Sequence, residues 1–351
     1  MSTIKLLCWN VEWMNDLFTA GSGPAAFRPD NEKPQHNTDT TVKTRREHLS
    51  GVLKDLAPDV VVVCEGPSRK EELKLFFDTD VPGTWQVDLQ SSKSPSQPQG
   101  QLQNIGIAVR TDTGKFAAPV LQLHDTASDK RFDPFLVDTD SDDVLEQHKF
   151  ERRPLLASVS PAGGAAFTVL GLHLKSKGIF DALEWSRWWD TADANRKKIL
   201  AQATEIRLKF LEPFLSDPAT KNTPLIVCGD INDGPGLDAS ERRLFGSGIE
   251  RLMGIIWRPE FCLGNALFDT LKPKDKIELD FSSIHTTSFK DPIFNGVYQK
   301  EWIDHILYSR NQAGAWVTGA QVHMKMPDGS AIYTKYKHAS DHFPVSVDVT
   351  T

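Results

Sequence analysis

Three observations predict an α/β fold for this chain of 351 residues. Short apolar runs rich in β-branched residues alternate with longer segments whose apolar residues recur at helical spacing. The chain is long enough to bury a large core. Short polar motifs follow apolar runs in both halves of the chain, and they can act together only if the halves converge. We therefore expect residues 1–351 to form one domain, although two domains would also fit the length.

The first half is expected to begin with a strand, a long loop, a helix and a second strand. Residues 4–9 form an apolar run, and residues 18–40 are rich in Gly, Pro, Asn and Asp, which favour turns. Between residues 41 and 56 leucine and valine recur at helical spacing, and Pro58 stops the helix. The β-branched run at 60–64 then predicts a buried strand.

Further strands are predicted from similar apolar runs, at 105–109, 167–173, 225–228, 303–308 and 345–349. A helix is expected over about 192–214, where isoleucine, alanine and phenylalanine share one helical face. The alternation of strands and helices in both halves suits two similar layers.

The composition restricts the class of protein. There are 40 Lys and Arg against 47 Asp and Glu, a net charge of −7, which argues against a nonspecific nucleic-acid coat. The four cysteines lack the spacing of a zinc site or a disulfide framework, so we expect free thiols and a reducing, cytoplasmic location. No apolar stretch approaches the length of a membrane span, and the short N-terminal apolar run does not fit a signal peptide.

Polar residues that could carry chemistry stand at the ends of the predicted strands. Six such motifs follow apolar runs: Trp9-Asn10, Cys64-Glu65, Gly171-Leu172-His173, Gly229-Asp230-Ile231-Asn232, Ile303-Asp304-His305 and Ser340-Asp341-His342. Strand ends can meet at a sheet edge and bring these carboxylates, amides and imidazoles side by side. A divalent cation and a phosphate could share such a set.

Each motif alone also has a purely structural explanation. Residues 229–233 could form a turn rich in Asp and Asn, and residues 340–342 could form a loop turn. If the strand continues, Asp230 and Asn232 lie on the same side, one able to accept a proton and the other to donate to a phosphate oxygen. The joint occurrence of the motifs, in this order, favours a phosphate-ester active site.

With these motifs the chain resembles the endonuclease/exonuclease/phosphatase superfamily, over essentially its whole length from Asn10 to His342. The resemblance implies a four-layer α/β sandwich, in which two facing mixed β-sheets are flanked by helices. It places the active site where the strand ends of both sheets meet. Members include nucleases, sphingomyelinases and inositol polyphosphate phosphatases, so the resemblance implies phosphoester hydrolysis without fixing the substrate.

The resemblance assigns metal binding to three residues. Glu65 matches the metal-binding glutamate, Asp341 a second metal carboxylate, and Asn10 the asparagine that supports the metal and the phosphate. Mg²⁺ or Mn²⁺ is the expected cofactor, because such ligands offer oxygen atoms. Cys64 stands where many members have a glutamine, so one supporting hydrogen bond around the metal is not accounted for.

The resemblance also assigns the catalytic residues. His173 matches the histidine that donates to a phosphoryl oxygen, and Asn232 the phosphate-binding asparagine. Asp230 matches the carboxylate that orients or deprotonates the attacking water. His342 matches the histidine nearest the scissile phosphate, and Asp304 the carboxylate that holds this histidine in one tautomer.

Weaker signals surround this set. Arg153 occupies a place where members often have an arginine near the site, and Lys175 and Lys177 could attract a phosphate or simply be solvated. His305 follows Asp304 and so faces the other side of the strand, which favours a packed histidine. A tryptophan-rich segment could stack on bases or a hydrophobic head group, or could anchor a loop. It contains Trp185, Trp188 and Trp189.

The sequence thus predicts a Mg²⁺- or Mn²⁺-dependent phosphodiesterase. Its expected substrate is nucleic acid, bound through Asn10, Arg153 and Lys175. The alternative is an enzyme acting on a small-molecule or lipid head-group phosphoester, which the acidic balance favours. A catalytically inactive binding protein on the same scaffold is disfavoured, because every ionisable position of the pattern is filled.

Overall fold

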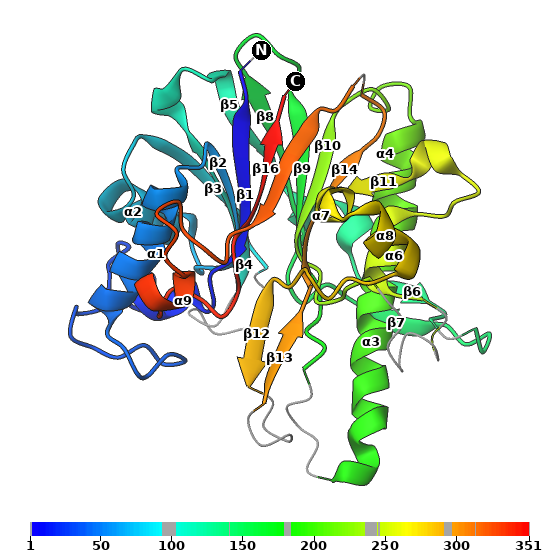
Figure 1. Ribbon diagram of the computed structural model, residues 1–351, viewed down its shortest axis with the longest axis horizontal. Helices are drawn as coiled ribbons and strands as arrows, with labels where there is room; N and C mark the ends of the chain where they lie inside the picture. Colours follow the sequence, from blue (N-terminus) through cyan, green and yellow to red (C-terminus); the bar gives the residue numbers. More distant parts are fainter. Residues whose placement is uncertain are drawn as a thin grey trace.

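Two β-sheets packed face to face form the centre of the molecule, with helices on both outer sides (Figure 1). The computed structural model describes residues 2–92, 103–139, 141–178, 184–235, 244, 246–290, 297–312 and 314–350. The two large sheets have six strands each, and each sheet contains parallel and antiparallel neighbours. The predicted four-layer α/β sandwich of two mixed sheets is confirmed.

The first sheet takes its strands from both ends of the chain, in the order β15-β16-β1-β2-β4-β3. They are β1 (Ile4–Asn10), β2 (Val60–Gly66), β3 (Trp85–Gln90), β4 (Asn104–Arg110), β15 (Val317–Val322) and β16 (Val345–Val349). The C-terminal strand β16 therefore lies beside the N-terminal strand β1, and both termini lie at the same end of the sandwich (Figure 1).

The second sheet is built from the middle and the last third of the chain, in the order β11-β14-β10-β9-β8-β5. They are β5 (Phe116–His124), β8 (Leu155–Pro161), β9 (Phe167–His173), β10 (Leu225–Asp230), β11 (Leu263–Asn265) and β14 (Asp304–Ser309). Two small hairpins stand apart from it: β6 (Phe135–Val137) pairs with β7 (Glu146–His148), and β12 (Thr287–Lys290) pairs with β13 (Tyr298–Glu301).

Helices cover the outer face of each sheet. On the side of the first sheet lie α1 (Val42–Leu56), α2 (Lys70–Asp80) and α9 (Ile332–Lys335). On the outer side of the second sheet lie α3 (Trp188–Glu205), α4 (Glu212–Ser216) and α6 (Gly248–Met253). Helix α7 (Ala266–Thr270) contacts β14 of the second sheet and β15 of the first, and α8 (Pro273–Glu278) follows it. None of the helices in the described part of the chain is long and apolar enough to cross a membrane.

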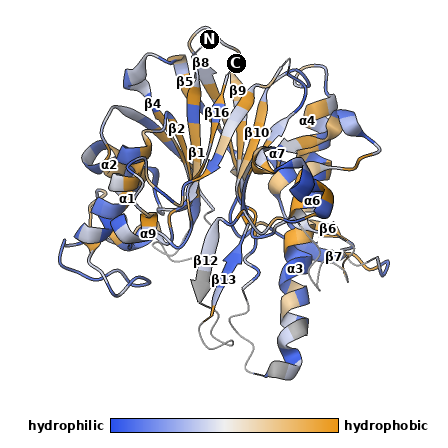
Figure 2. Ribbon diagram, in the orientation of Figure 1, coloured by the Kyte–Doolittle hydropathy of each residue, from blue (hydrophilic) through white to orange (hydrophobic). Residues whose placement is uncertain are grey.

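Apolar residues on both faces of the strands explain this layering. One core cluster lies between the sheets and includes Leu6, Val62, Val169 and Ile306. A second cluster joins the first sheet to α1 and α2, and a third joins the second sheet to α3 and its continuation. The strands are accordingly the most hydrophobic part of the ribbon (Figure 2). Strands buried on both faces read as continuous apolar runs, which is why they were predictable.

The long helix of the second half differs from its prediction. We expected one helix over about 192–214, but α3 already begins at Trp188 and passes through a π-helical segment, Ile206–Leu211, into α4. A short 3₁₀ turn precedes it at Trp185–Arg187. Of the three tryptophans, Trp188 is half-buried, while the side chains of Trp185 and Trp189 lie outside the described residues. The four cysteines are free thiols, as expected.

Candidate active site

In the first sheet, strand pairing brings three of the motifs to one edge. Parallel pairing of β1 and β2 sets Asn10 opposite Cys64, so that Glu65 follows at the same end. Antiparallel pairing of β1 and β16 sets Cys8 opposite Val345. His342 precedes β16 by three residues and therefore reaches the end of β1, where Trp9 Nε1 donates to its carbonyl oxygen at 3.0 Å.

In the second sheet, register places three site residues in one row. Asp230 at the end of β10 lies opposite His173 of β9 and opposite Asp304 of β14. Gly229 makes this close pairing possible, because a Cβ at that position would stand 1.7 Å from the carbonyl oxygen of Leu172. Its φ of +148° is also a value that L side chains rarely adopt.

Asn10 joins the two sheets across the site. Its Nδ2 donates to Glu65 Oε1 at 3.2 Å and to Asp230 Oδ2 at 3.0 Å. Its Oδ1 accepts from the backbone N of Glu12 at 3.0 Å. All three polar contacts fix the carboxamide in one orientation, so the first-sheet and second-sheet halves of the site have a defined separation.

His342 and Asp304 form a buried carboxylate–imidazole pair. His342 Nδ1 lies 2.7 Å from Asp304 Oδ2, which leaves Nε2 facing Asp230 Oδ2 at 3.9 Å. The backbone N of Asp304 donates to Thr286 Oγ1, and Asp304 Oδ1 has no hydrogen-bond partner in the described chain. Burial opposes protonation of the imidazole, but the carboxylates of Asp304, Asp341 and Asp230 outweigh it and raise the pKa of His342 well above its ordinary value. The imidazole is therefore held as a cation.

The side chain of Asp230 is buried, unlike an ordinary surface carboxylate. Burial, followed by the nearby charge of Asp304, raises the pKa of Asp230 to about 7, although His342 and the hydrogen bond from Asn10 oppose the shift. Its Oδ1 accepts from the backbone N of Asn232 at 2.9 Å. A carboxylate with a pKa near 7 can exchange a proton with water at neutral pH.

The turn after β10 is an Asp–Asn turn as well as part of the site. The strand ends at Asp230, and Asn232 has a φ of +57°, so strand alternation does not place its side chain as we expected. Asn232 Nδ2 donates to the carbonyl oxygen of Leu174 at 3.2 Å. An amide carries two hydrogens, and one donor remains for a phosphate oxygen.

His173 is a neutral donor beside this group. Burial, then the charges of Arg152 and His342, lower the pKa of His173 well below its ordinary value. Its Nε2 lies 3.5 Å from Asp230 Oδ2, and its buried Nδ1 has no hydrogen-bond partner among the residues that the structure describes. A neutral imidazole here can donate one hydrogen bond without adding a charge.

A cluster of carboxylates lies at the edge of the first sheet and includes a residue that the sequence analysis missed. Burial, followed by the charge of Asp341, raises the pKa of Glu12 to about 7, with Arg45 opposing and Glu65 adding to the shift. Glu12 is therefore a neighbour of both carboxylates predicted to bind the metal. Its position two residues after Asn10 was the available signal, but it lies beyond the strand end.

The residues present fit a hard divalent cation. Asp341 has a side chain that is 49% exposed, so a metal could reach it from solvent. The charges of Asp341 and Glu65 disfavour the ionised form of Glu12, and a bound cation would relieve that repulsion. Another ligand-competent group, formed by Asp230, Asp304 and His342, is fully buried. The hydrogen bonds described above already satisfy much of that group.

Gln103 makes a hydrogen bond to Glu65, of the kind that was not accounted for with Cys64 in place of a glutamine. Its Nε2 donates to Glu65 Oε2 at 2.6 Å, and its Oε1 accepts from Arg152 Nη2 at 2.6 Å. Gln103 directly precedes β4, which pairs with β2, so the amide reaches Glu65 from the neighbouring strand. Cys64 instead points its thiol to the carbonyl oxygen of Leu172.

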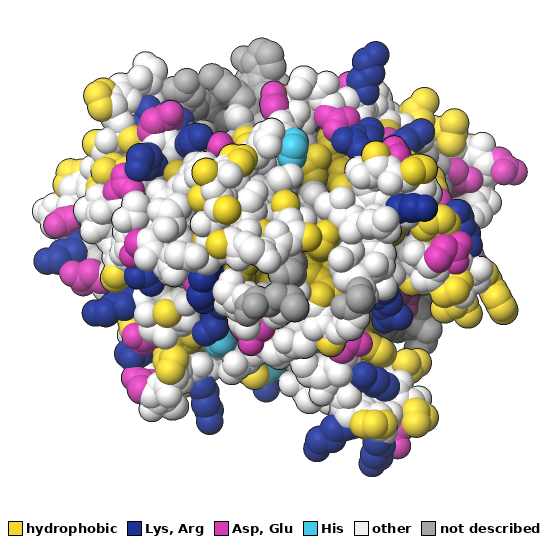
Figure 3. Space-filling view, turned by 90° about the horizontal axis from the view of Figure 1, so that it is seen from above, with side chains coloured by type: hydrophobic (Ala, Val, Ile, Leu, Met, Phe, Trp, Pro, Cys, Tyr) yellow, Lys and Arg dark blue, Asp and Glu magenta, His cyan; other side chains and the backbone are white. Residues whose placement is uncertain are grey.

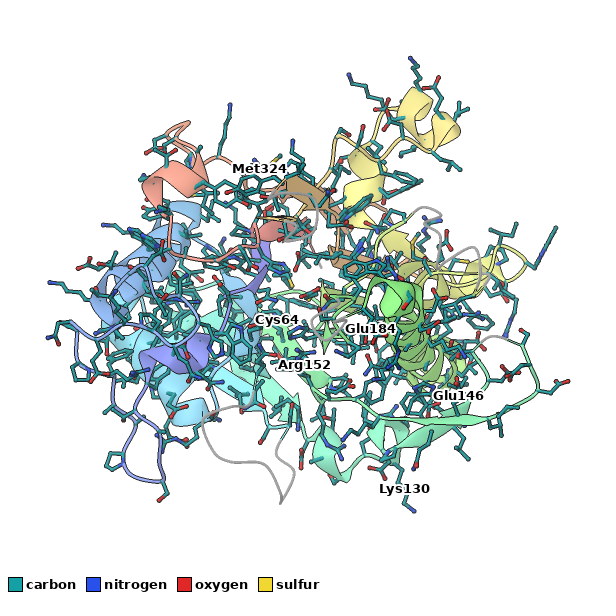
Figure 4. The ribbon with its side chains drawn as sticks, turned by 90° about the horizontal axis from the view of Figure 1, so that it is seen from below. Cys64, Lys130, Glu146, Arg152, Glu184 and Met324 are labelled. Carbon is teal, nitrogen blue, oxygen red and sulfur yellow. The ribbon has the colours of Figure 1, made fainter. Side chains whose placement is uncertain are left out.

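The arginine beside the site is Arg152, one residue before the predicted Arg153. Arg152 Nη1 donates to the carbonyl oxygen of Leu174 at 3.2 Å, and Figure 4, viewed from the end that carries the site, shows Arg152 and Cys64 near the centre of the molecule. Arg153 Nη1 donates to the carbonyl oxygen of Thr126, and its Nη2 lies 3.6 Å from Asp133. Neighbouring residues of an extended segment point in opposite directions, so Arg153 makes different contacts from Arg152, and its role in substrate binding stays a prediction.

The remaining predicted residues lie at the margin. The backbone N of Lys175 donates to Gln202 Oε1, and Lys177 Nζ pairs with Glu301 of β13 at 2.9 Å. His305 is buried, with its ring nitrogens 3.1 Å from Asn265 Nδ2 and 2.9 Å from the carbonyl oxygen of Asp233. It is a packed histidine, as its position on the strand favoured.

No protein-family model and no curated protein matches the sequence. Solved structures with a similar fold include humanized TDP2 from D. rerio, 14% identical with a TM-score of 0.48, where the match covers 99% of each chain. An endonuclease/exonuclease/phosphatase family protein from Bacteroides thetaiotaomicron is 13% identical with a TM-score of 0.49, over 99% of this chain and 95% of that one. D. rerio TDP2 complexed with a single-strand DNA product is 13% identical with a TM-score of 0.46, over 100% of both chains.

Proposed function

We propose that this protein is a Mg²⁺- or Mn²⁺-dependent phosphodiesterase of the endonuclease/exonuclease/phosphatase superfamily that hydrolyses nucleic-acid phosphodiester bonds by in-line attack of water. The observation that carries the proposal is the row His173–Asp230–Asp304, joined through Asn10 to Glu65 and through Asp304 to His342. Separate segments of the chain converge there into one set of acid, base and oxygen ligands.

A divalent cation would be held at the carboxylate cluster. Glu65 and Asp341 would be its carboxylate ligands, with the side-chain oxygen of Asn10 nearby. When bound, Mg²⁺ or Mn²⁺ would act as a Lewis acid on the non-bridging phosphate oxygens. Carboxylate and amide oxygens suit these metals better than they suit Zn²⁺.

The chain's own residues provide the proton transfer and the charge stabilisation. Asp230, with a pKa of about 7, can take a proton from water as the water attacks phosphorus. His342 is held protonated by Asp304 and can offset negative charge that develops on the phosphoryl oxygens. His173 and Asn232 can each donate one hydrogen bond to the same oxygens. Together these groups meet the requirements of an in-line displacement.

Nucleic acid is the proposed substrate, and a small-molecule or lipid head-group phosphoester is the alternative. The alternative is favoured by the net charge of −7 and by the ion pair of Lys177 with Glu301, which engages one of the two lysines that could attract a phosphate. The end of the molecule that carries the termini, opposite the candidate site, shows interspersed basic and acidic side chains (Figure 3). A nucleic-acid substrate must therefore be recognised by local contacts beside the scissile phosphate. The cytoplasmic location stays a prediction.

The test is an activity panel with plasmid DNA, single-stranded DNA, RNA, bis-p-nitrophenyl phosphate and sphingomyelin, with and without a chelator. We expect Mg²⁺ or Mn²⁺ to restore activity after chelation, and Asp230→Asn to lower kcat about a hundredfold to ten-thousandfold, because an amide cannot accept the proton. Asp217→Asn, in an exposed loop, is the matched control.

Calorimetry separates the base from the metal ligands. Asp230→Asn should bind Mg²⁺ nearly as wild type does, whereas Glu65→Gln should bind it much more weakly. Activity above about a tenth of wild type in Asp230→Asn would remove Asp230 from the role of base. Absence of turnover on every substrate would favour the inactive binding protein instead.

A further inference from the structure

The segment that leads away from Asn10 has a strained backbone. Glu12 and Trp13 are consecutive left-handed residues, with φ of 51° and 52°. This conformation is uncommon for residues other than glycine, and more so for a bulky side chain such as Trp13. Arg45, fully buried, holds the segment by donating to the carbonyl oxygens of Val11 and Glu12. Strain that the surrounding structure maintains beside a site suggests a functional placement of the side chain concerned.

The strained turn sets the indole of Trp13 beside the proposed metal ligands. The backbone N of Trp13 donates to Glu65 Oε2 at 2.8 Å. Its ring stacks on the imidazole of His36, with ring centroids 3.8 Å apart and planes 9° from parallel. The backbone N of His36 donates to Asp16 Oδ2 at 2.7 Å, and its Nδ1 lies 3.2 Å from the same oxygen. We call Trp13 and His36 the stacked pair; the side chain of His36 is 35% exposed, so the pair reaches the surface.

A cavity of about 560 Å³ is lined by Asp16, the residue that His36 contacts through its backbone N and Nδ1. One wall contains Asn15, Asp16 and Gln35, which are neighbours of Trp13 and His36 in sequence. Ser68 and Arg69, just before α2, also line the cavity, and Ser68 Oγ donates to Asn15 Oδ1 at 2.8 Å. Ser68 is three residues after Glu65, so their Cα atoms are at most about 10 Å apart. A cavity of this size is typical of a small-molecule site and can hold one nucleoside.

We infer that the stacked pair and this cavity form a subsite for an unpaired nucleobase next to the scissile phosphate. The inference rests on the proposed function and names its substrate as nucleic acid with a single-stranded segment at the cleavage point. Aromatic side chains bind bases by stacking without sequence preference, and a base in a duplex has both faces covered by its neighbours. The walls carry charged and amide groups, which suit the polar edges of a base and not an acyl chain.

Binding of oligonucleotides tests the inference without turnover. In the Asp230→Asn background, Trp13→Ala should raise the Kd for a fluorescent single-stranded oligonucleotide about 5- to 150-fold, the range expected for one stacked base. Replacing one base of the oligonucleotide by an abasic unit, at successive positions, should reproduce this loss at one position. For the oligonucleotide that is abasic at that position, Trp13→Ala should raise the Kd little further, because the missing base and the indole would contact each other.

Two further variants control the experiment. His36→Ala keeps Trp13 and its bond to Glu65, and it should also raise the Kd. It serves as the test variant in case Trp13→Ala does not fold. His48→Ala removes a histidine that stacks on His338 instead of on Trp13, and it should leave the Kd unchanged. Equal Kd values for the parent, Trp13→Ala and His36→Ala would overturn the inference, as would a loss that is the same at every abasic position.

Other outcomes separate this inference from the proposed function. If the wild type hydrolyses bis-p-nitrophenyl phosphate but no abasic position matters for oligonucleotide binding, the phosphodiesterase stands and the base subsite is overturned. If Trp13→Ala impairs hydrolysis of sphingomyelin vesicles but not oligonucleotide binding, the stacked pair serves a lipid head group, which also overturns it. If no phosphoester is cleaved although the abasic effect is present, the subsite stands and the proposed reaction fails.

Discussion

Asp230 accepts hydrogen bonds at both of its oxygens, from Asn10 and from the backbone of Asn232. These donors fix its orientation, while burial and Asp304 favour its protonated form. The imidazole of His342 is the nearest cation to this carboxylate and is held by Asp304 on its other side. The residues therefore act in pairs, and the effects of replacing them should not be independent.

Asp304 and His342 should behave as one unit. Without Asp304 the imidazole loses both its orientation and the charge that keeps it protonated, so Asp304→Ala should cost nearly as much kcat/KM as His342→Ala, about a hundredfold to ten-thousandfold. The double variant should be little worse than either single one. Steady-state kinetics on bis-p-nitrophenyl phosphate measures this. Losses that add fully in the logarithm of kcat/KM would show that the carboxylate does not act through the histidine.

Gln103 should affect the metal without touching it. Gln103→Ala removes the amide that donates to Glu65 and the acceptor of Arg152, and supporting residues of this kind typically change metal affinity about 10- to 100-fold. Titration calorimetry with Mn²⁺ should show this weaker binding. Gln86→Ala is the matched control, because Gln86 contacts only the carbonyl oxygen of Leu121 among the hydrogen bonds of its amide in the described chain. An unchanged Kd in Gln103→Ala would mean that Glu65 is fixed by other contacts.

At the scale of the element, β10 determines the geometry of the second half of the site. Its two neighbours place His173 and Asp304 opposite Asp230, and this register requires close approach of β9 at Gly229. A shift of one residue would turn Asp230 to the other face of the sheet. The position of Asp230, the proposed general base, is thus a property of strand pairing and not of a loop.

Gly229→Ala should therefore damage the whole site. The added Cβ would stand 1.7 Å from a backbone oxygen, so β9 and β10 must separate or the chain must fail to fold. We expect a loss of several kcal/mol in the free energy of unfolding, within the range of severe single substitutions. Urea titration measures it. Gly163→Ala is the control: its φ is +76° but nothing lies near the new Cβ, so about 1 kcal/mol is expected. Equal effects of the two variants would contradict this account of the register.

The strands that carry the site could be predicted because they are buried on both faces and read as apolar runs. Other elements gave weaker patterns. Strand β5 lies at the edge of its sheet and exposes much of its length, so it forms no continuous apolar run. Helix α2 has its buried Leu73, Phe76 and Phe77 at helical spacing and could have been found.

Tertiary contacts explain the site residues that sequence alone could not provide. Gln103, just before β4, contacts Glu65 directly, whereas Arg152 contacts Gln103, and nothing in the local sequence distinguishes Arg152 from Arg153. The proposed stacking role of Trp13 depends on a left-handed backbone conformation that no sequence motif predicts. The motifs lie at strand ends and were predictable, whereas the residues that support and surround them depend on which strands become neighbours.

At the scale of the whole molecule, burial of histidines links the fold to pH. Burial lowers the pKa of His305 to about 3, so its imidazole stays neutral in the folded chain. Below its ordinary pKa of about 6.5 the unfolded chain binds a proton that the folded chain does not. Stability from His305 is then full above about pH 6.5 and is lost as pH falls from about 6.5 to about 3. The raised pKa values of Asp230 and Glu12 act in the opposite direction over part of this range.

A comparison of two proteins isolates the histidine. Between pH 7.5 and pH 5 the wild type should lose about 2 kcal/mol of unfolding free energy relative to His305→Gln. Below about pH 6.5 the unfolded wild type binds one more proton than the folded protein, which lowers the unfolding free energy by about 1.4 kcal/mol per pH unit. Urea titrations at the two pH values supply the four free energies required. A difference between the proteins that does not change with pH would show that His305 can be protonated within the fold.

Arg45 has a practical consequence for anyone who handles this protein. The guanidinium of Arg45 is fully buried and lies 3.9 Å from Glu12 Oε2. Burial lowers the pKa of Arg45, while the charges of Glu12, Asp16, Asp341 and Glu65 oppose this effect. A positive charge that belongs to the chain cannot be removed by dialysis, so part of the repulsion among these carboxylates stays balanced after chelation. The protein should remain folded in a chelating buffer and accept a chosen ion afterwards. Paramagnetic Mn²⁺ could then be introduced as a probe, and its broadening of nearby resonances would map which side chains surround the reaction centre.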